Sequence, residues 1–252
     1  MATTLRCYCY LSEGSAMRPL VNLLNRALDA SLGLRVQPSS SERLRRTRLK
    51  VLRDFRCELV VDVGANNGDW ANGLRKENYM GRIESFEPTE IFESLKQKSS
   101  KDDFWFVHNL ALSNFTGEAA MNLADNGFLS SSLLTPTGIL ESNKGISFKT
   151  GEKVSVSTLD KHFAGMRQEK IYLKMDVQGA ELSVMKGGEG FLERCCAVEF
   201  ESALVPQYEG EESHYEIVSW LQSKGFQQKQ VVITHWNKDL ETVALDSIFV
   251  RS

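Results

Sequence analysis

Residues 59–70, LVVDVGANNGDW, change from an apolar run to small residues and then to a helical pattern. The valines of this run are β-branched and lie on both faces of an extended chain, which is typical of a buried strand in a parallel sheet. Gly64 and Gly68 bracket the turn, and glycine adopts positive φ without steric cost. We therefore expect a strand, a turn whose main-chain N–H groups face a ligand, and a helix.

This turn differs from the Gly-x-Gly-x-x-Gly pattern that binds a pyrophosphate in dinucleotide folds. Asn66 replaces the middle glycine, so a diphosphate is less easily accommodated. Asp62 places a carboxylate at the strand end, which suits a cationic or amine-bearing ligand better. Ala65 and Asn67 complete the expected ligand-binding segment. A purely structural turn and the turn of a dinucleotide-dependent oxidoreductase are the alternatives.

The composition favours one main domain without a membrane span. The chain has 252 residues, of which 42% are hydrophobic. This is enough for one large hydrophobic core and too few for two domains that each have a large core. A net charge of −3 argues against a nucleic acid partner. No apolar run approaches the roughly 18 residues that cross a bilayer, and the start lacks a secretory signal. The five cysteines fit neither a disulfide framework nor a zinc site, so we expect reduced thiols and a cytoplasmic protein.

Residues 1–50 are expected to form a helical extension in front of a domain of residues 51–252. Residues 19–34 carry one apolar stripe at helical spacing, and Ser39 with Glu42 predicts a capping box for a second helix. A basic run then follows between leucines. We interpret it as the solvated face of a helix, with contact to a polyanion as the alternative. Its members are Arg43, Arg45, Arg46, Arg48, Lys50 and Arg53.

Two further strand ends carry polar candidates. A second strand is predicted over residues 82–87 and is ended by Pro88. Glu87 lies about 20 residues beyond the glycine turn, where doubly wound folds place a carboxylate that binds ribose hydroxyls. A surface glutamate that caps the next helix is the alternative. Asn109 follows a third predicted strand, where its amide could recognise an adenine edge or satisfy a turn.

A long polar segment, residues 125–151, contains Phe128, Leu129, Leu133 and Leu134 among serines, threonines and glycines. Loops of this length in compact domains are usually functional or disordered. We interpret it as a lid on the substrate side, with a mobile and inert loop as the alternative.

Residues 171–181, IYLKMDVQGAE, predict another strand that runs into Asp176, followed by a turn and a helix. Because side chains alternate along a strand, Lys174 and Asp176 point to the same face. They lie at the carboxyl edge of the sheet, where doubly wound proteins bind ligands. A fifth predicted strand brings Glu199 and Glu201 next to Asp176.

Five ordered blocks of the sequence resemble the conserved blocks of the FkbM-type methyltransferases. The resemblance covers about residues 51–201, and this chain has Gln178 where the family pattern usually has glutamate. The blocks are VDVGANNG (61–68), SFEP (85–88), NLALS (109–113), VSTLD (156–160) and LKMDVQGAELSVMKG (173–187).

The resemblance implies a class I (Rossmann-like) methyltransferase fold: a seven-stranded, mostly parallel α/β sheet with a reversed last strand and helices on both faces. It also implies S-adenosylmethionine as cofactor and S-adenosylhomocysteine as product. The leading interpretation is O-methylation of a hydroxyl on a sugar, glycan or natural product. N-methylation of an amide side chain in a peptide natural product is the alternative. The acceptor is then a small molecule, glycan or peptide, and a homodimer is compatible with the sequence.

Methyl transfer to a hydroxyl requires close positioning and a base. Asp176 is the first candidate, Glu199 the second and His235 the third, with Lys174 beside them as their charge partner. A lone histidine is more often structural. A divalent cation between Asp176 and Glu199 is compatible with these residues, but nothing in the spacing requires it. The other alternative is a binding or scaffold protein that has this fold without catalysing a reaction, and it would need no acidic residue at this edge of the sheet.

Overall fold

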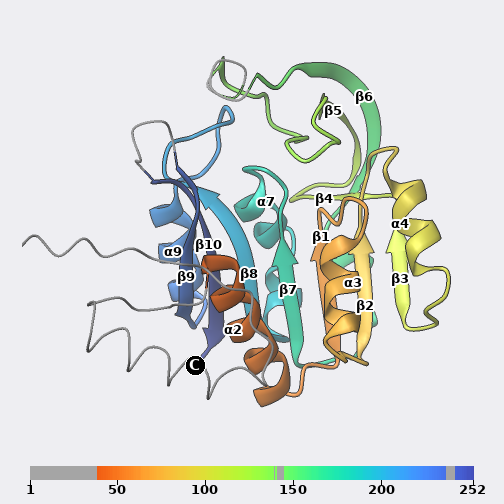
Figure 1. Ribbon diagram of the computed structural model, residues 1–252, viewed down its shortest axis with the longest axis vertical. Helices are drawn as coiled ribbons and strands as arrows, with labels where there is room; N and C mark the ends of the chain where they lie inside the picture. Colours follow the sequence, from red (N-terminus) through yellow and green to blue (C-terminus); the bar gives the residue numbers. More distant parts are fainter. Residues whose placement is uncertain (1–38, 139, 141–144, 237–241) are drawn as a thin grey trace, which may run out of the picture.

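Seven strands form the main sheet in the computed structural model, which describes residues 39–138, 140, 145–236 and 242–252. Their order is β3-β2-β1-β7-β8-β10-β9, and every pairing is parallel except the two made by β10. The predicted seven-stranded sheet with a reversed last strand is therefore confirmed (Figure 1). The bounds are β1 Leu59–Val63, β2 Arg82–Phe86, β3 Trp105–His108, β7 Ile171–Met175, β8 Cys195–Ala203, β9 Phe226–Trp236 and β10 Thr242–Arg251.

Helices cover both faces of this sheet and bury one apolar cluster on each. One face packs against α2 (Ser40–Asp54), α3 (Asp69–Lys76) and α4 (Phe92–Ser99). The other packs against α6 (Leu159–His162), α7 (Glu181–Lys186), α8 (Glu189–Leu192) and α9 (His214–Ser223). In the part of the chain that the structure describes, no helix has the length and apolar character needed to cross a membrane.

Helix α2 belongs to the sheet domain rather than to a separate extension. The predicted boundary between residues 50 and 51 falls inside this helix, and Leu44, Val51 and Leu52 are buried against the sheet. The Ser39 side chain accepts the Glu42 amide at 3.2 Å, as the capping box predicts. The Glu42 carboxylate does not complete the box but binds two arginines of its own helix. The helix predicted over residues 19–34 lies outside the described residues.

A smaller sheet, in the order β4-β6-β5, lies beside the carboxyl ends of β1 and β2 (Figure 1). Its strands are β4 (Ala111–Leu112), β5 (Gly117–Ala124) and β6 (Phe148–Ser157). The sequence predicts a polar loop as far as residue 151, but β6 begins at Phe148 and pairs with β5 along nearly all its length. This pairing places an apolar wall, which includes Met121, opposite the main sheet.

Candidate active site

An open cleft lies where β1, β2 and β7 end, between the main sheet and the smaller one. The empty space inside it, counted together with its open mouth, is about 630 Å³. One wall is apolar and includes Leu110, Leu112, Met121, Phe128 and Leu133. The other wall contains five of the predicted ligand-binding residues, namely Gly64, Asn66, Glu87, Pro88 and Asp176.

The amides of the glycine turn are bonded within the protein. In this conformation they do not point freely at a ligand, and their part in ligand binding stays a prediction. The amides of Gly64 and Ala65 donate to the Phe86 carbonyl at 3.0 and 2.9 Å. The Asn66 amide donates to the Glu87 carboxylate at 2.8 Å, and the Asn67 amide donates to the Asn66 side chain at 2.8 Å. The Gly68 amide donates to the Ala65 carbonyl at 2.9 Å.

The two glycines of the turn have the expected positive φ, +74° for Gly64 and +80° for Gly68. The neighbour that each must avoid is a protein atom rather than a ligand. A Cβ on Gly64 would lie 1.9 Å from the Asp176 carbonyl oxygen, and a Cβ on Gly68 would lie 2.7 Å from Leu95. Asn66 also has positive φ, which asparagine tolerates better than most residues. The turn thus fixes β1 against the end of β7.

Glu87 lies at the mouth of the turn with its side chain in the cleft. Its carboxylate accepts the Asn66 amide at 2.8 Å and the Thr89 amide at 3.0 Å, so it is held in one orientation. The side chain of Asn109 donates to the carbonyls of Glu87 and Pro88 at 3.1 and 3.2 Å. Asn109 therefore satisfies a turn, the second of its two predicted roles, and does not line the cleft.

Asp62 and Lys174 pair with each other below the cleft. The Lys174 Nζ lies 3.0 Å from Asp62 Oδ1 and donates to the Gly64 carbonyl at 3.2 Å. Asp62 is fully buried and also accepts the Ser85 hydroxyl at 3.4 Å. In this conformation a lysine of the protein pairs with the Asp62 carboxylate, and the role of Asp62 toward a cationic ligand stays a prediction. Lys174 also differs from expectation, since its partner is Asp62 rather than Asp176 or Glu199.

Asp176 is the predicted catalytic residue that reaches the cleft. Its carboxylate accepts the Gln178 side-chain amide at 2.7 Å, and the same nitrogen donates to Glu201 at 3.1 Å. The Gln178 oxygen accepts the Tyr208 hydroxyl at 3.2 Å. Burial raises the pKa of Asp176 above its ordinary value, although the charge of Lys174 acts against this. A buried carboxylate with a raised pKa is a stronger base than an exposed one.

Glu199 lies away from the cleft, contrary to the prediction. Its carboxylate accepts the Arg48 Nε at 2.7 Å and the Tyr172 hydroxyl at 2.6 Å, and Arg48 binds the second oxygen as well. Both oxygens of Glu199 are thus engaged by Arg48 and Tyr172, away from Asp176. The same contacts correct the interpretation of the basic run, because Arg48 points into the protein rather than to solvent. Spacing could not reveal this pair, which joins residues 151 positions apart.

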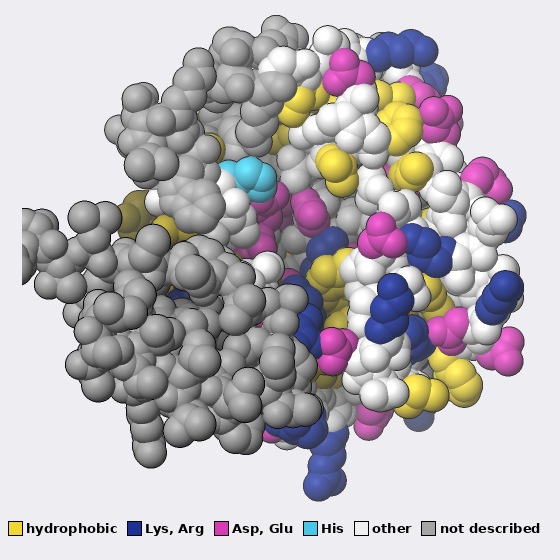
Figure 2. Space-filling view, in the orientation of Figure 1, with side chains coloured by type: hydrophobic (Ala, Val, Ile, Leu, Met, Phe, Trp, Pro, Cys, Tyr) yellow, Lys and Arg dark blue, Asp and Glu magenta, His cyan; other side chains and the backbone are white. Residues whose placement is uncertain are grey.

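His235 lies within β9 rather than beyond its end. Its side chain is about half exposed, and its Nδ1 lies 3.4 Å from Glu201. It does not line the cleft but stands at the edge of the acidic group that contains Glu201 and Asp176. Figure 2 shows acidic side chains gathered in a hollow of the surface, beside a histidine.

The described part of the predicted lid packs against the cleft. Phe128 and Leu129 line it, and the Asn66 side chain donates to the Gly127 carbonyl at 3.0 Å. The Tyr208 hydroxyl donates to the Ser130 carbonyl at 2.8 Å. These contacts tie the segment to the glycine turn and to the loop after β8. Whether it opens and closes stays a prediction, and residues 139 and 141–144 lie outside the described chain.

A family model described as "Methyltransferase FkbM domain" matches residues 62–227, more than half of the chain. The chain belongs to the FkbM methyltransferase family. The matched region contains the glycine turn, Glu87, Asp176 and the cleft between them. The resemblance drawn from the sequence blocks is therefore confirmed. No curated protein matches the chain.

Solved structures with a similar arrangement are distant in sequence. The magnesium protoporphyrin IX methyltransferase of Synechocystis PCC 6803, solved with bound SAM, is 11% identical with a TM-score of 0.48, over 84% of this chain and 79% of that one. The methyltransferase domain of bacterial CtHen1 is 13% identical with a TM-score of 0.45, over 84% of this chain and 100% of that one. A SAM-dependent methyltransferase from Aquifex aeolicus is 14% identical with a TM-score of 0.41, over 81% and 89%. These scores are low, so the fold assignment rests on the strand order and the family match.

Proposed function

We propose that this FkbM-family protein uses S-adenosylmethionine to methylate a hydroxyl on a sugar, glycan or natural product. The observation that carries the proposal is the carboxylate of Asp176, which lines the cleft at the end of β7 and has a raised pKa. A hydroxyl acceptor needs such a group because its proton must leave as the oxygen is methylated.

The cleft fits the nucleoside end of the cofactor. Glu87 is oriented by two backbone amides and by the Thr89 hydroxyl and lines the cleft, so the remaining acceptor site on its Oε2 can accept a ribose hydroxyl. Pro88 and the apolar wall around Leu110 and Met121 suit the flat face of a purine. The cofactor supplies a methyl group on a sulfonium, which leaves as the thioether of S-adenosylhomocysteine. Asp62 would bind the positively charged end of S-adenosylmethionine only if Lys174 moved away.

The residues of the chain would then act as follows. Asp176 accepts the proton of the acceptor hydroxyl, and Gln178 holds the carboxylate in place through its side-chain amide. Phe128 and Leu129 line the cleft and give the reacting groups apolar neighbours. The segment from Asp125 to the start of β6 lies outside the five sequence blocks that carry the resemblance, so we assign the choice of acceptor to it.

We predict that Asp176→Asn keeps the affinity for S-adenosylmethionine within about threefold and slows methyl transfer by about 10²–10⁴-fold. The affinity is measured by calorimetry, with Asp103→Asn, an exposed carboxyl, as the control. Transfer is measured with isotope-labelled methyl groups and a panel of sugars, glycans and amide-bearing peptides. Labelled methyl on oxygen supports the proposal, whereas label on an amide nitrogen would replace it with N-methylation. Binding of NAD without binding of either sulfur nucleoside would refute both.

We also propose that the protein works in the cytoplasm. The described cysteines, Cys57, Cys195 and Cys196, are all buried free thiols. Buried free thiols of this kind suit a reducing compartment. We propose that the binding partner of the cleft is the methyl acceptor. A net charge of −3 gives no reason to propose nucleic acid as a further partner.

A further inference from the structure

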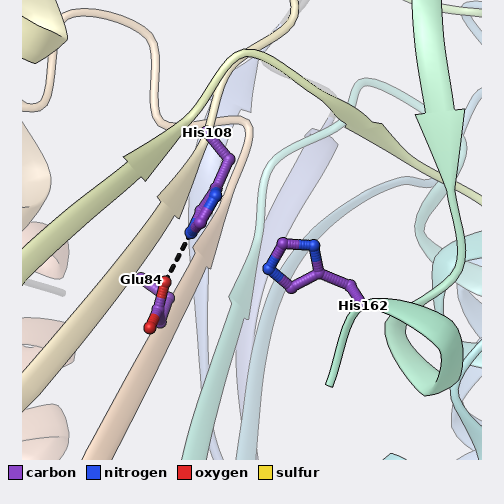
Figure 3. A group of neighbouring side chains, drawn as sticks. All are labelled: Glu84, His108 and His162. Atoms are coloured by element: carbon purple, nitrogen blue, oxygen red, sulfur yellow. Dashed lines mark hydrogen bonds and ion pairs between the residues drawn. The ribbon is translucent and has the colours of Figure 1, made fainter. Parts of the chain in front are cut away.

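A second group of polar side chains lies beside the cleft, under α6. Glu84 comes from β2, His108 from the end of β3 and His162 from α6, and Figure 3 shows them turned toward one another. The His108 Nε2 lies 2.5 Å from Glu84 Oε2. One ligand atom from each residue lies within 4.8 Å of the other two. The group is separate from the proposed methyl-transfer residues but touches Phe86, which lines the cleft.

The carboxylate of Glu84 is oriented from both sides. It is 1% exposed, and Arg82 binds its Oε1 while Oε2 faces His108. The rings of His108 and His162 pack edge to face, with centroids 4.6 Å apart. Three elements thus converge on one small volume with two imidazoles and a carboxylate oxygen. The simplest alternative is a protonated His108 that only pairs with Glu84.

We propose that Glu84, His108 and His162 bind one divalent transition-metal ion, with Zn²⁺ as the best-fitting ion and water as the fourth ligand. Imidazole nitrogen with carboxylate oxygen suits Zn²⁺, whereas Mg²⁺ and Ca²⁺ prefer oxygen alone. Bonds of about 2.0–2.2 Å around tetrahedral Zn²⁺ separate the ligand atoms by roughly 3.3 Å. The His108–Glu84 contact must therefore open and His162 must approach, both by small side-chain rotations. Arg82 then orients Glu84 from outside the coordination shell.

The ion would join two neighbouring strands to α6 next to the proposed cofactor site. The His108 carbonyl accepts the Glu87 amide at 3.0 Å, so the backbone that carries this ligand also supports Glu87. Its binding does not depend on the acceptor or on methyl transfer. It can therefore be tested by itself, and its failure would leave the proposed function untouched.

The test uses the full-length protein, stripped with a chelator and titrated with Zn²⁺ by calorimetry. We expect one ion per chain, and at least about 10-fold weaker binding in His162→Ala. His162 is partly exposed, and its removal leaves the Arg82–Glu84–His108 contacts in place, so the variant should fold. Equal melting temperatures of wild type and variant in chelator would confirm this. His235→Ala, which removes an exposed histidine elsewhere, should bind like the wild type.

Co²⁺ in place of Zn²⁺ identifies the ligands. A tetrahedral visible spectrum without a thiolate charge-transfer band, lost in His162→Ala, supports the proposed site. A thiolate band would assign the ion to cysteines such as Cys57 and Cys196 instead. That band, unchanged binding in His162→Ala, or no binding by the wild type would each overturn the proposal.

Discussion

Gln178 is the residue on which the acidic side of the cleft depends. Its single nitrogen donates to Asp176 and Glu201, and its oxygen accepts from Tyr208. An amide supplies both donor and acceptor, whereas an ionised carboxylate only accepts. The glutamate usual in the family at this position would put a third negative charge between two others. The departure from the family pattern is visible in the sequence, but its meaning needs the position of Glu201.

We predict that Gln178→Glu lowers the free energy of unfolding by on the order of 1–3 kcal/mol at pH 8 and by less at pH 5. Repulsion from Asp176 and Glu201 raises the pKa of the new carboxyl, so the protonated form that can donate is favoured at low pH. Urea unfolding at the two pH values measures this, with the exposed Gln222→Glu as the control. An equal loss at both pH values would show that charge is not the cause.

Among the elements, the strands are predictable and their side-chain partners are not. The runs at residues 59–63 and 171–175 are buried on both faces, and their mostly apolar sequences show this in one segment alone. Partners that meet across the sheet leave no such local signal. Helix α2 shows this best, because its arginines look alike in sequence, yet Arg45 binds Glu42 of the same helix and Arg48 enters the core to bind Glu199.

We predict that Arg48→Met costs about 3–5 kcal/mol of unfolding free energy, because it leaves the Glu199 carboxylate buried without its cation. The matched control is Lys50→Met in the same helix, whose lysine pairs with Asp54 at the surface and should cost less than about 1 kcal/mol. Denaturant unfolding compares the two. The double variant Arg48→Met with Glu199→Gln should recover part of the loss, and equal costs for the two single variants would contradict a buried pair.

At the scale of the whole molecule, the seven-stranded sheet with its reversed last strand followed from the resemblance of the sequence blocks, but the cleft followed only in part. Glu87 and Asp176 could be predicted because each ends a parallel strand, and such ends meet at one edge of the sheet. Asp62 ends a strand too, but a lysine two places before Asp176 neutralises it. The opposite wall depends on the pairing of β5 with β6 across an intervening segment, which no local pattern indicates. The pKa values of the acidic residues likewise depend on charges that only the assembled sheet brings together.

Asp246 is a residue whose pKa is changed by its neighbours in the assembled sheet. It lies on β10 opposite Glu201 of β8, and burial together with the charges of Glu201 and Glu199 raises its pKa to about 8 from an ordinary 3.8. The folded state therefore holds a proton at Asp246 that the unfolded chain has already released. Between about pH 4 and pH 8, this carboxyl makes the free energy of unfolding fall as the pH rises.

Asp246→Asn removes the titration without changing the shape of the side chain. Each unit of pKa shift corresponds to about 1.4 kcal/mol, so the variant should gain at least about 1 kcal/mol over the wild type between pH 5 and pH 8. Urea unfolding across this range measures the difference between the two curves. Asp103→Asn, an exposed carboxyl on the far edge of the sheet, should run parallel to the wild type. If Asp246→Asn also ran parallel, the acidic group around Glu201 would be hydrated in solution, and the raised pKa of Asp176 that supports its role as a base would lose its physical cause as well.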